Sequence, residues 1–191
     1  MLIGITGKLG SGKSTAAEYL QTNHNFREYS MARPLKEIGC LFGFTQEQMY
    51  GTQEQKLEIH PYWGVSGRQF LQKVGTELFR NQLTKVLPEM KIKRTIWTEL
   101  FKYKYHCDPS INYVVSDVRF KDEAETIREL GGIIIRTIRT NTVTSKTGEE
   151  HVHVSELEMD GVEADFIINN DELTLKQVNE FLDKIVRKTI R

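Results

Sequence analysis

The N-terminal segment contains the most specific arrangement of chemically useful residues in the chain. Residues 7–14 read Gly-Lys-Leu-Gly-Ser-Gly-Lys-Ser and satisfy the pattern GxxxxGK[ST] in full. Glycines let a loop adopt positive φ angles and bring backbone N–H groups against phosphate oxygens. An apolar run at 2–6 precedes the loop and a helical pattern follows Lys13. We therefore predict a phosphate-binding loop between a strand and a helix, with a glycine-rich turn and a solvated lysine as the alternative.

Each position of this loop has its own task in binding a nucleoside triphosphate. Lys13 neutralises β- and γ-phosphate oxygens, and the Ser14 hydroxyl is placed to bind Mg²⁺. The helix that begins near Lys13 adds the positive end of its dipole. Thr15 is expected to cap the helix or to line the α-phosphate side. The predicted nucleotide contacts are Gly7, Leu9, Gly10, Ser11, Gly12, Lys13, Ser14 and Thr15.

A second polar cluster follows the apolar run at 113–116. Asp117 and Arg119 lie two residues apart at the end of this expected strand. An aspartate there can hold Mg²⁺ through water or orient an acceptor phosphate, and an arginine can bind a phosphoryl oxygen through two hydrogen bonds. We predict catalytic roles for Lys13, Asp117 and Arg119 and metal contacts for Ser14 and Asp117. An N-cap aspartate beside a surface arginine is the ordinary alternative.

A third set of polar side chains lies in the segment 66–87, where apolar residues recur with helical spacing. Arg68, Gln72 and Thr76 follow the spacing i, i+4, i+8 and share the helix face opposite the apolar one. They suit a phosphate group together with the edge of a base, although a solvated face is the ordinary alternative. Gly75 in this helix costs about 1 kcal/mol relative to alanine, which indicates close approach of a ligand or another backbone.

Two further arginines, Arg136 and Arg139, lie at the end of the apolar run 133–138 and lead into a polar segment. Arginines on a mobile segment of this kind can exclude water and stabilise charge on a transferring phosphoryl group. We predict catalytic roles for both arginines and a small lid at about 139–152. A plain surface hairpin is the alternative.

Strand-like runs alternate with helical patterns along most of the chain. The expected strands are residues 2–6, 26–30, 113–116, 133–138 and 166–168, and the expected helices include 66–87 and 92–105. This alternation predicts an α/β fold, a parallel sheet flanked by helices, which binds ligands at the carboxyl ends of its strands. We expect one domain over residues 1–191. Its core is about 1–43 and 108–191, and an acceptor-binding helical part covers about 44–107.

The composition of the 191-residue chain excludes several classes of protein. Positive and negative side chains balance at 26 each, so nothing favours nucleic-acid binding. No apolar run approaches the roughly 20 residues of a membrane span, and no signal peptide is expected. The two cysteines, Cys40 and Cys107, show no pairing pattern, which indicates a reducing, cytoplasmic setting. We expect neither nucleic acid nor membrane among the partners.

Together the motifs resemble those of the phage-type deoxynucleoside monophosphate kinase family. The matching stretches are residues 7–14, 30–36, 68–80, 116–124, 153–156 and 165–170. These stretches span nearly the whole chain in the family's order, which is more specific than the glycine loop alone. The resemblance implies a P-loop fold with a monophosphate-binding part and a lid. It also implies ATP- and Mg²⁺-dependent conversion of deoxynucleoside monophosphates to diphosphates.

The resemblance further implies which residues contact the acceptor. These are Arg68, Gln72, Gly75 and Thr76, with Trp97 as a base-stacking residue and Asp117 near the reacting phosphates. An aromatic residue at the helical spacing of Trp97 also fits a position in the core.

Two positions depart from the family's pattern, which often has aspartate where this chain has Ser14 and Arg33. Ser14 agrees with the general loop pattern, so conventional Mg²⁺ coordination is expected. Arg33, and Lys36 from the same matching stretch, are candidates for acceptor contacts, and acceptor preference is therefore not transferred from relatives. By analogy with phage proteins, we expect a homodimer in the host cytoplasm.

Other functions share the phosphate loop. GTPases carry an NKxD motif, which this sequence lacks, and motor-type ATPases usually have longer chains. A different small-molecule kinase, of the dephospho-coenzyme A or phosphomevalonate type, remains an alternative. A non-catalytic nucleotide-binding regulator is the alternative from another class.

Overall fold

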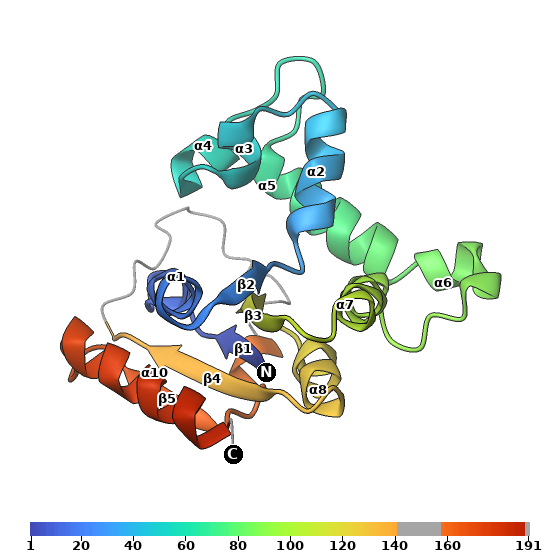
Figure 1. The fold of residues 1–191 in the computed structure, drawn as a ribbon. Coiled ribbons are helices and arrows are strands. Elements are labelled where there is room, and N and C mark those ends of the chain that lie inside the picture. Colours follow the sequence, from blue (N-terminus) through green and yellow to red (C-terminus); the bar gives the residue numbers. More distant parts are fainter. Residues whose placement is uncertain (141–157, 190–191) are drawn as a thin grey trace. The chain divides into compact units, whose positions relative to one another are not determined.

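A computed structural model describes residues 1–140 and 158–189 (Figure 1). The chain forms two compact units, Met1–Ser30 with Lys104–Arg191, and Met31–Tyr103. The first contains the sheet and the second is helical. The boundary between them follows Ser30, so the helix α2 (Arg33–Leu41) groups with the helical unit and its α3 and α5 rather than with the sheet core.

The sheet has five parallel strands in the order β2-β3-β1-β4-β5. The strands are β1 (Leu2–Thr6), β2 (Phe26–Tyr29), β3 (Asn112–Val118), β4 (Ile133–Ile138) and β5 (Phe166–Asn169). Every strand predicted from the sequence is present, and the α/β fold is confirmed. Because β1 is central and bordered on both sides, its carboxyl end lies in the middle of the edge where ligands bind.

Helices cover both faces of the sheet (Figure 1). The helices α1 (Lys13–His24) and α10 (Leu175–Thr189) pack on one face, where Leu20, Ile135 and Leu182 are fully buried. Burying one such side chain stabilises the fold by roughly 1.5–3 kcal/mol. The helix α8 (Lys121–Glu129) covers the other face so closely that a Cβ on Gly4 would lie 2.7 Å from Ile127 Cδ1.

The helical unit departs most from the sequence-based expectation. The expected helix 66–87 is divided into α5 (Gly67–Gln72), the π-helix η1 (Lys73–Arg80) and α6 (Leu83–Val86). A 3₁₀ turn, η2 (Pro88–Met90), follows, and α7 (Ile96–Cys107) begins later than expected. The polar segment before residue 66 holds two short helices, α3 (Gln46–Tyr50) and α4 (Gln53–Leu57). Each begins with a capping box, Thr45 with Gln48 and Thr52 with Gln55.

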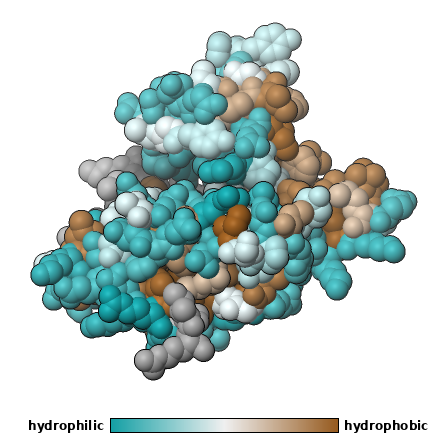
Figure 2. All heavy atoms as spheres, in the orientation of Figure 1, coloured by the Kyte–Doolittle hydropathy of each residue, from teal (hydrophilic) through white to brown (hydrophobic). Residues whose placement is uncertain are grey.

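Aromatic side chains hold this polar segment against the end of α2. Phe42 packs near Trp63 and Phe70, with ring centroids 6.0 and 5.5 Å away, and the Trp63 indole N–H donates to the Phe42 carbonyl at 2.6 Å. Figure 2 shows apolar surface over α2 and over α6, where Leu41 and Val86 are exposed. The segment is thus a packed part of the helical unit.

Candidate active site

The glycine loop joins β1 to α1 at the carboxyl edge of the sheet, and its backbone requires glycine. Gly7, Gly10 and Gly12 all have positive φ angles, of 146°, 77° and 100°. A Cβ on Gly7 would lie 2.3 Å from the Thr137 carbonyl oxygen, and one on Gly12 would lie 2.4 Å from Asn170 Nδ2. Leu9, Ser14 and Thr15 are exposed around this loop. The local geometry is the one that the sequence predicts for a phosphate-binding loop.

The Lys13 side chain folds back over the loop. Its Nζ donates to the carbonyl oxygens of Gly7 at 2.6 Å and Lys8 at 2.7 Å. Burial, and to a smaller extent the Arg119 charge, lower the pKa of Lys13 from 10.5 to about 8, while Asp117 acts in the opposite direction. The ammonium group therefore lies where it is poorly solvated, and phosphate oxygens would stabilise its charge.

Asp117 lies at an irregularity of β3. Gly4 pairs with Val115 and Thr6 with Val118, so Ile5 of β1 opposes both Ser116 and Asp117. Such a bulge changes the alternation of side chains and commonly re-aims a residue next to a site. Asp117 Oδ2 accepts a 2.7 Å hydrogen bond from the Ser30 hydroxyl just after β2. This bond restricts the orientation of the carboxylate.

Arg119 is exposed on the turn between β3 and α8. The Glu123 carboxylate, which is 3% exposed, accepts hydrogen bonds from the backbone N–H groups of Arg119 at 2.8 Å and Phe120 at 3.1 Å. This contact caps α8 and fixes the turn that carries Arg119. The charges of Asp117 and Arg119 both act on the pKa of Lys13, so these three predicted residues lie within electrostatic reach of one another in the sheet unit.

Arg136 occupies a different face from the glycine loop. Its neighbours in β4 face the α1 side, where Ile135 joins the core and the Thr137 hydroxyl lies 2.7 Å from Ser11 Oγ. Arg136 Nη2 donates to the carbonyl oxygens of Met159 at 3.1 Å and of Val162. These bonds link β4 to the segment 159–162, which is a structural role for Arg136. Its predicted catalytic role stays a prediction.

Arg139 is exposed immediately after β4, close to the turn that follows β5. The hydroxyl and the backbone N–H of Thr140 bond to the Asp171 carboxylate and lower its pKa, and the Arg139 charge acts in the same direction. The expected lid at 139–152 lies almost entirely outside the described residues, as does the matching stretch 153–156. A catalytic role for Arg139 likewise stays a prediction.

In the helical unit, Arg68, Gln72 and Thr76 are all partly buried along α5 and η1. Around the axis of an α-helix, residue i+4 lies 40° past residue i, because four residues exceed one turn. A π-helix has a wider turn, so the angle between Gln72 and Thr76 is smaller and offsets that difference. The π-helix therefore keeps Thr76 in line with Arg68. Arg68 Nη1 donates to Gln53 Oε1 at 2.8 Å, which links the first of these three residues to α4.

Gly75 and Trp97 have clear packing roles in the same unit. A Cβ on Gly75 would lie 2.4 Å from Leu35 Cδ2, so the close neighbour is an apolar side chain of α2 rather than a backbone. Trp97 is 7% exposed, packs against Phe79 with centroids 5.4 Å apart, and donates its indole N–H to the Gly75 carbonyl at 3.1 Å. This geometry favours the core alternative for Trp97.

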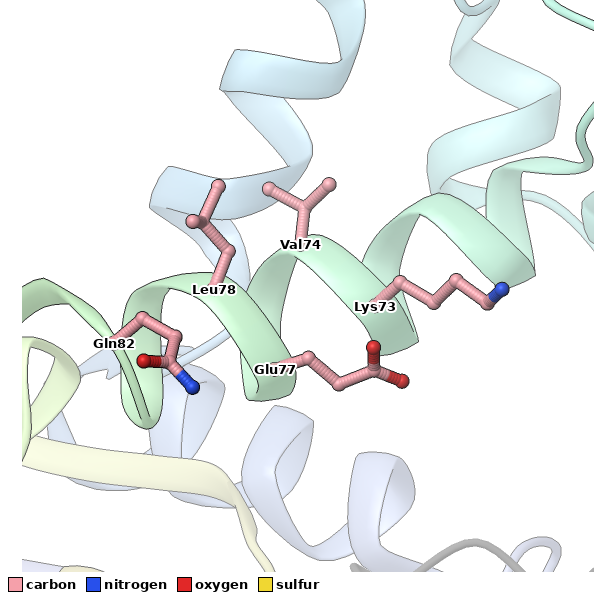
Figure 3. A pocket seen from close by; sticks show the side chains of 5 residues that line it. All are labelled: Lys73, Val74, Glu77, Leu78 and Gln82. Atoms are coloured by element: carbon pink, nitrogen blue, oxygen red, sulfur yellow. The ribbon is translucent and has the colours of Figure 1, made fainter.

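An open hollow of about 410 Å³ runs along the same helical segment. Figure 3 shows its lining: Val74 and Leu78 point one way, while Lys73, Glu77 and Gln82 point another. These residues interleave in sequence with the predicted acceptor contacts.

Of the remaining candidates, Arg33 is exposed at the start of α2, and Lys36 Nζ lies 4.8 Å from the centroid of the Tyr50 ring.

Four residues that touch the loop or its neighbours were not among the sequence-based candidates: Ser30, Glu123, Thr137 and Asn170. Asn170 Nδ2 donates to the Ser11 carbonyl at 2.5 Å. Ser30 directly follows β2 and Asn170 directly follows β5, at the sheet edge where ligands bind. The position of Asn170 carried a usable signal because it comes just after the apolar run 166–168, whereas β2 reads Phe-Arg-Glu-Tyr. Thr137 and Glu123 lie inside regular elements and gave no such signal.

The parallel sheet, the glycine loop between β1 and α1, and the lysine folded over that loop define the P-loop class of nucleotide-binding proteins. The crystal structure of TT1252 from Thermus thermophilus shares the fold. It has a TM-score of 0.50 and 15% identity, and the match covers 98% of this chain and 97% of that chain.

Sequence comparisons identify the family within this class. Residues 41–185 match the deoxynucleotide monophosphate kinase family. A protein of Acanthamoeba polyphaga mimivirus, named as a candidate deoxynucleotide monophosphate kinase, is 39% identical over 97% of this chain and 94% of its own length. The deoxynucleotide monophosphate kinase of Escherichia phage RB69 is 27% identical over 68% of this chain and 47% of its own length. The chain belongs to the deoxynucleotide monophosphate kinase family and is a kinase.

Proposed function

We propose that this kinase transfers the γ-phosphoryl group of ATP to deoxynucleoside 5′-monophosphates, and that it supplies the diphosphates for DNA synthesis. The observation that carries the proposal is the position of Lys13. Its ammonium group lies among the loop carbonyls, within electrostatic reach of Asp117 and Arg119. A poorly solvated cation beside a second charged cluster suits an anion with several phosphates.

The reaction needs positioning and charge neutralisation rather than a general base, because the acceptor phosphate is already an oxyanion. An acceptor oxygen bonds to the γ-phosphorus, the bond from that phosphorus to the β,γ-bridging oxygen breaks, and ADP leaves with the electron pair. Lys13 and Arg119 would stabilise the negative charge that spreads over the transferring group. Asp117, restrained by Ser30, would orient the acceptor phosphate or the metal.

The available oxygen ligands fit Mg²⁺. Among residues 1–140 and 158–189, no group of three or more His, Cys, Asp or Glu side chains could hold a metal. Mg²⁺ typically takes one or two protein oxygens and completes its shell with water and substrate phosphates. The exposed Ser14 hydroxyl and the Asp117 carboxylate are such a pair, and we assign them as the candidate ligands. Bound there, Mg²⁺ would neutralise charge on the phosphates.

Recognition of the acceptor is assigned to the helical unit. Arg68 would bind the monophosphate, while Gln72 and Thr76, on the same side of the helix, would form hydrogen bonds with the edge of the base. Arg33 and Lys36 remain further candidates for contacts with the acceptor. Gly75 is kept as a candidate through its helix position, and Trp97 as the least favoured because it is buried.

The test is ADP release with ATP and Mg²⁺ against dAMP, dGMP, dCMP and dTMP, their ribose counterparts, dephospho-coenzyme A and phosphomevalonate. Release with one or more deoxynucleotides, lost in Lys13→Ala and Arg68→Ala, would support the proposal. Release only with dephospho-coenzyme A or phosphomevalonate would replace the acceptor. Tight ATP binding without turnover on any monophosphate would instead favour a nucleotide-binding regulator.

The location and assembly of the protein are also proposals. In the described part of the chain, none of the helices combines the length and apolarity that a membrane crossing requires. We propose that the kinase acts in the cytoplasm, which is the host cytoplasm for a viral protein, and that it forms a homodimer. Light scattering coupled to gel filtration would decide between monomer and dimer.

A further inference from the structure

The turn after β5 makes a direct contact with the glycine loop. Asn170 Nδ2 donates to the Ser11 carbonyl oxygen at 2.5 Å, although the two residues are 159 positions apart. The same amide nitrogen lies 2.4 Å from where a Cβ on Gly12 would be. The Asn170 side chain therefore occupies the space that the missing side chain of Gly12 leaves, and it contacts the peptide between Ser11 and Gly12.

Holding the Ser11 carbonyl fixes the direction of the next N–H group. The peptide bonds described are all trans, and in a planar trans peptide the C=O and the following N–H point in opposite directions. Because the Ser11 oxygen points to Asn170, the Gly12 N–H points away from Asn170. Gly12 is the N-cap of α1 and has no Cβ to restrict a rotation of this peptide. Without Asn170, one of the loop's potential phosphate donors would lose its fixed orientation.

Asn170 is itself held on both sides. Its backbone N–H donates to the Ile138 carbonyl at 2.8 Å, which ties it to the end of β4. The next residue, Asp171, accepts hydrogen bonds from Thr140. On the other side of the loop, Ser11 Oγ lies 2.7 Å from Thr137 Oγ1. The Ser11–Gly12 peptide is therefore connected through side chains to the carboxyl ends of β4 and β5.

We propose that Asn170 is a positioning residue for the nucleotide: it presets the Ser11–Gly12 peptide so that the Gly12 N–H can donate to a phosphate oxygen of the bound nucleoside di- or triphosphate. The proposal rests on the nucleotide-binding function proposed for the loop. It assigns Asn170 no contact with the acceptor, so its effect is confined to the nucleotide side of the reaction.

The test compares Asn170→Asp with Asn169→Asp. Asn170→Asp keeps the shape of the side chain but replaces the donor with an oxygen that repels the Ser11 carbonyl. Asn169→Asp adds the same charge one residue away and keeps the acceptor that binds the Asp171 N–H at 3.2 Å. The control therefore separates loss of the hydrogen bond from general repulsion of an anionic ligand. Asn170→Ala removes the amide without adding charge, and it decides the matter if Asn170→Asp does not fold.

ADP binding is measured by calorimetry without any acceptor, so the result does not depend on turnover. We expect Asn170→Asp and Asn170→Ala to weaken ADP binding about tenfold, the loss of one partly buried hydrogen bond to a phosphate-binding group. Asn169→Asp should stay within about twofold, since its hydrogen bond is retained. In turnover assays, KM for ATP should rise in the Asn170 variants while KM for the monophosphate is unchanged. In NMR spectra, the shift of the Gly12 amide on ADP addition should shrink in Asn170→Ala.

Two results would overturn the proposal. One is ADP binding by Asn170→Ala at wild-type strength. The other is equal weakening in Asn170→Asp and Asn169→Asp, which would reduce the effect to added charge. Failure of the proposed acceptor specificity is separate, because it would leave the ADP comparison intact. Absence of ADP binding in the unaltered protein would remove both proposals together.

Discussion

Lys13 should take up a proton when nucleotide binds at mildly alkaline pH. Burial and Arg119 hold its pKa at about 8 instead of 10.5. That difference corresponds to about 3 kcal/mol that opposes the charged form in the empty loop. Phosphate oxygens favour the charged form, so binding should return the pKa toward its ordinary value. The proton uptake then follows from the fraction of Lys13 that is neutral before binding.

The expected uptake depends steeply on pH. If the bound form is fully protonated, uptake is about 0.1 proton at pH 7, about 0.5 at pH 8 and about 0.9 at pH 9. ADP affinity should fall over the same range, because an increasing part of the binding free energy is needed to protonate the lysine. Calorimetric titration with ADP in buffers of different protonation enthalpy measures the uptake directly, as the slope of the observed enthalpy.

Lys13→Arg is the matched control, since a guanidinium stays protonated throughout this range. Its uptake at pH 8 should be close to zero if it still binds ADP. An uptake in the unaltered protein that does not increase between pH 7 and pH 9 would refute the reasoning. An equal uptake in Lys13→Arg would assign the proton to another group.

Three further predictions concern individual side-chain hydrogen bonds. Ser30→Ala removes the 2.7 Å hydrogen bond to Asp117 and should lower kcat by about fivefold, the worth of about 1 kcal/mol. Ser116→Ala, which removes a similar bond from the hydroxyl to Glu28, is the control, and equal kcat losses would contradict the role of Ser30. Trp97→Phe keeps the packing but loses the bond to the Gly75 carbonyl. It should lower the free energy of unfolding by about 1 kcal/mol without changing KM for the monophosphate, whereas a raised KM would restore the base-stacking role. Hydrogen bonds from His24 and Tyr19 lower the pKa of Asp183 below 3.8, so they contribute stability above that pH that is lost as the carboxylate protonates. Thermal unfolding from pH 6 to pH 2 should therefore be less pH-dependent in Asp183→Asn, and an unchanged profile would exclude this contribution.

The order of elements was readable from the sequence because each signal is local. Four of the five strands contain a short apolar run, and β2 is the exception. Gly43 and Gly131, with φ angles of 88° and 77°, come just after α2 and α8, where glycine commonly ends a helix. The capping boxes at Thr45 and Thr52 were also present in the sequence and could have predicted α3 and α4. The π-helix could not be predicted, because Gly75 meets Leu35 and Trp97 only after the helical unit has packed.

The same distinction separates the two parts of the candidate site. The sequence by itself determined the phosphate loop, because residues 7–14 are contiguous and their glycines dictate the backbone that they form. Only the tertiary structure decided what holds that loop and its partner Asp117. Ser30 reaches Asp117 across 87 positions and Asn170 reaches Ser11 across 159. These contacts exist because the strand order β2-β3-β1-β4-β5 places the carboxyl ends of distant strands side by side.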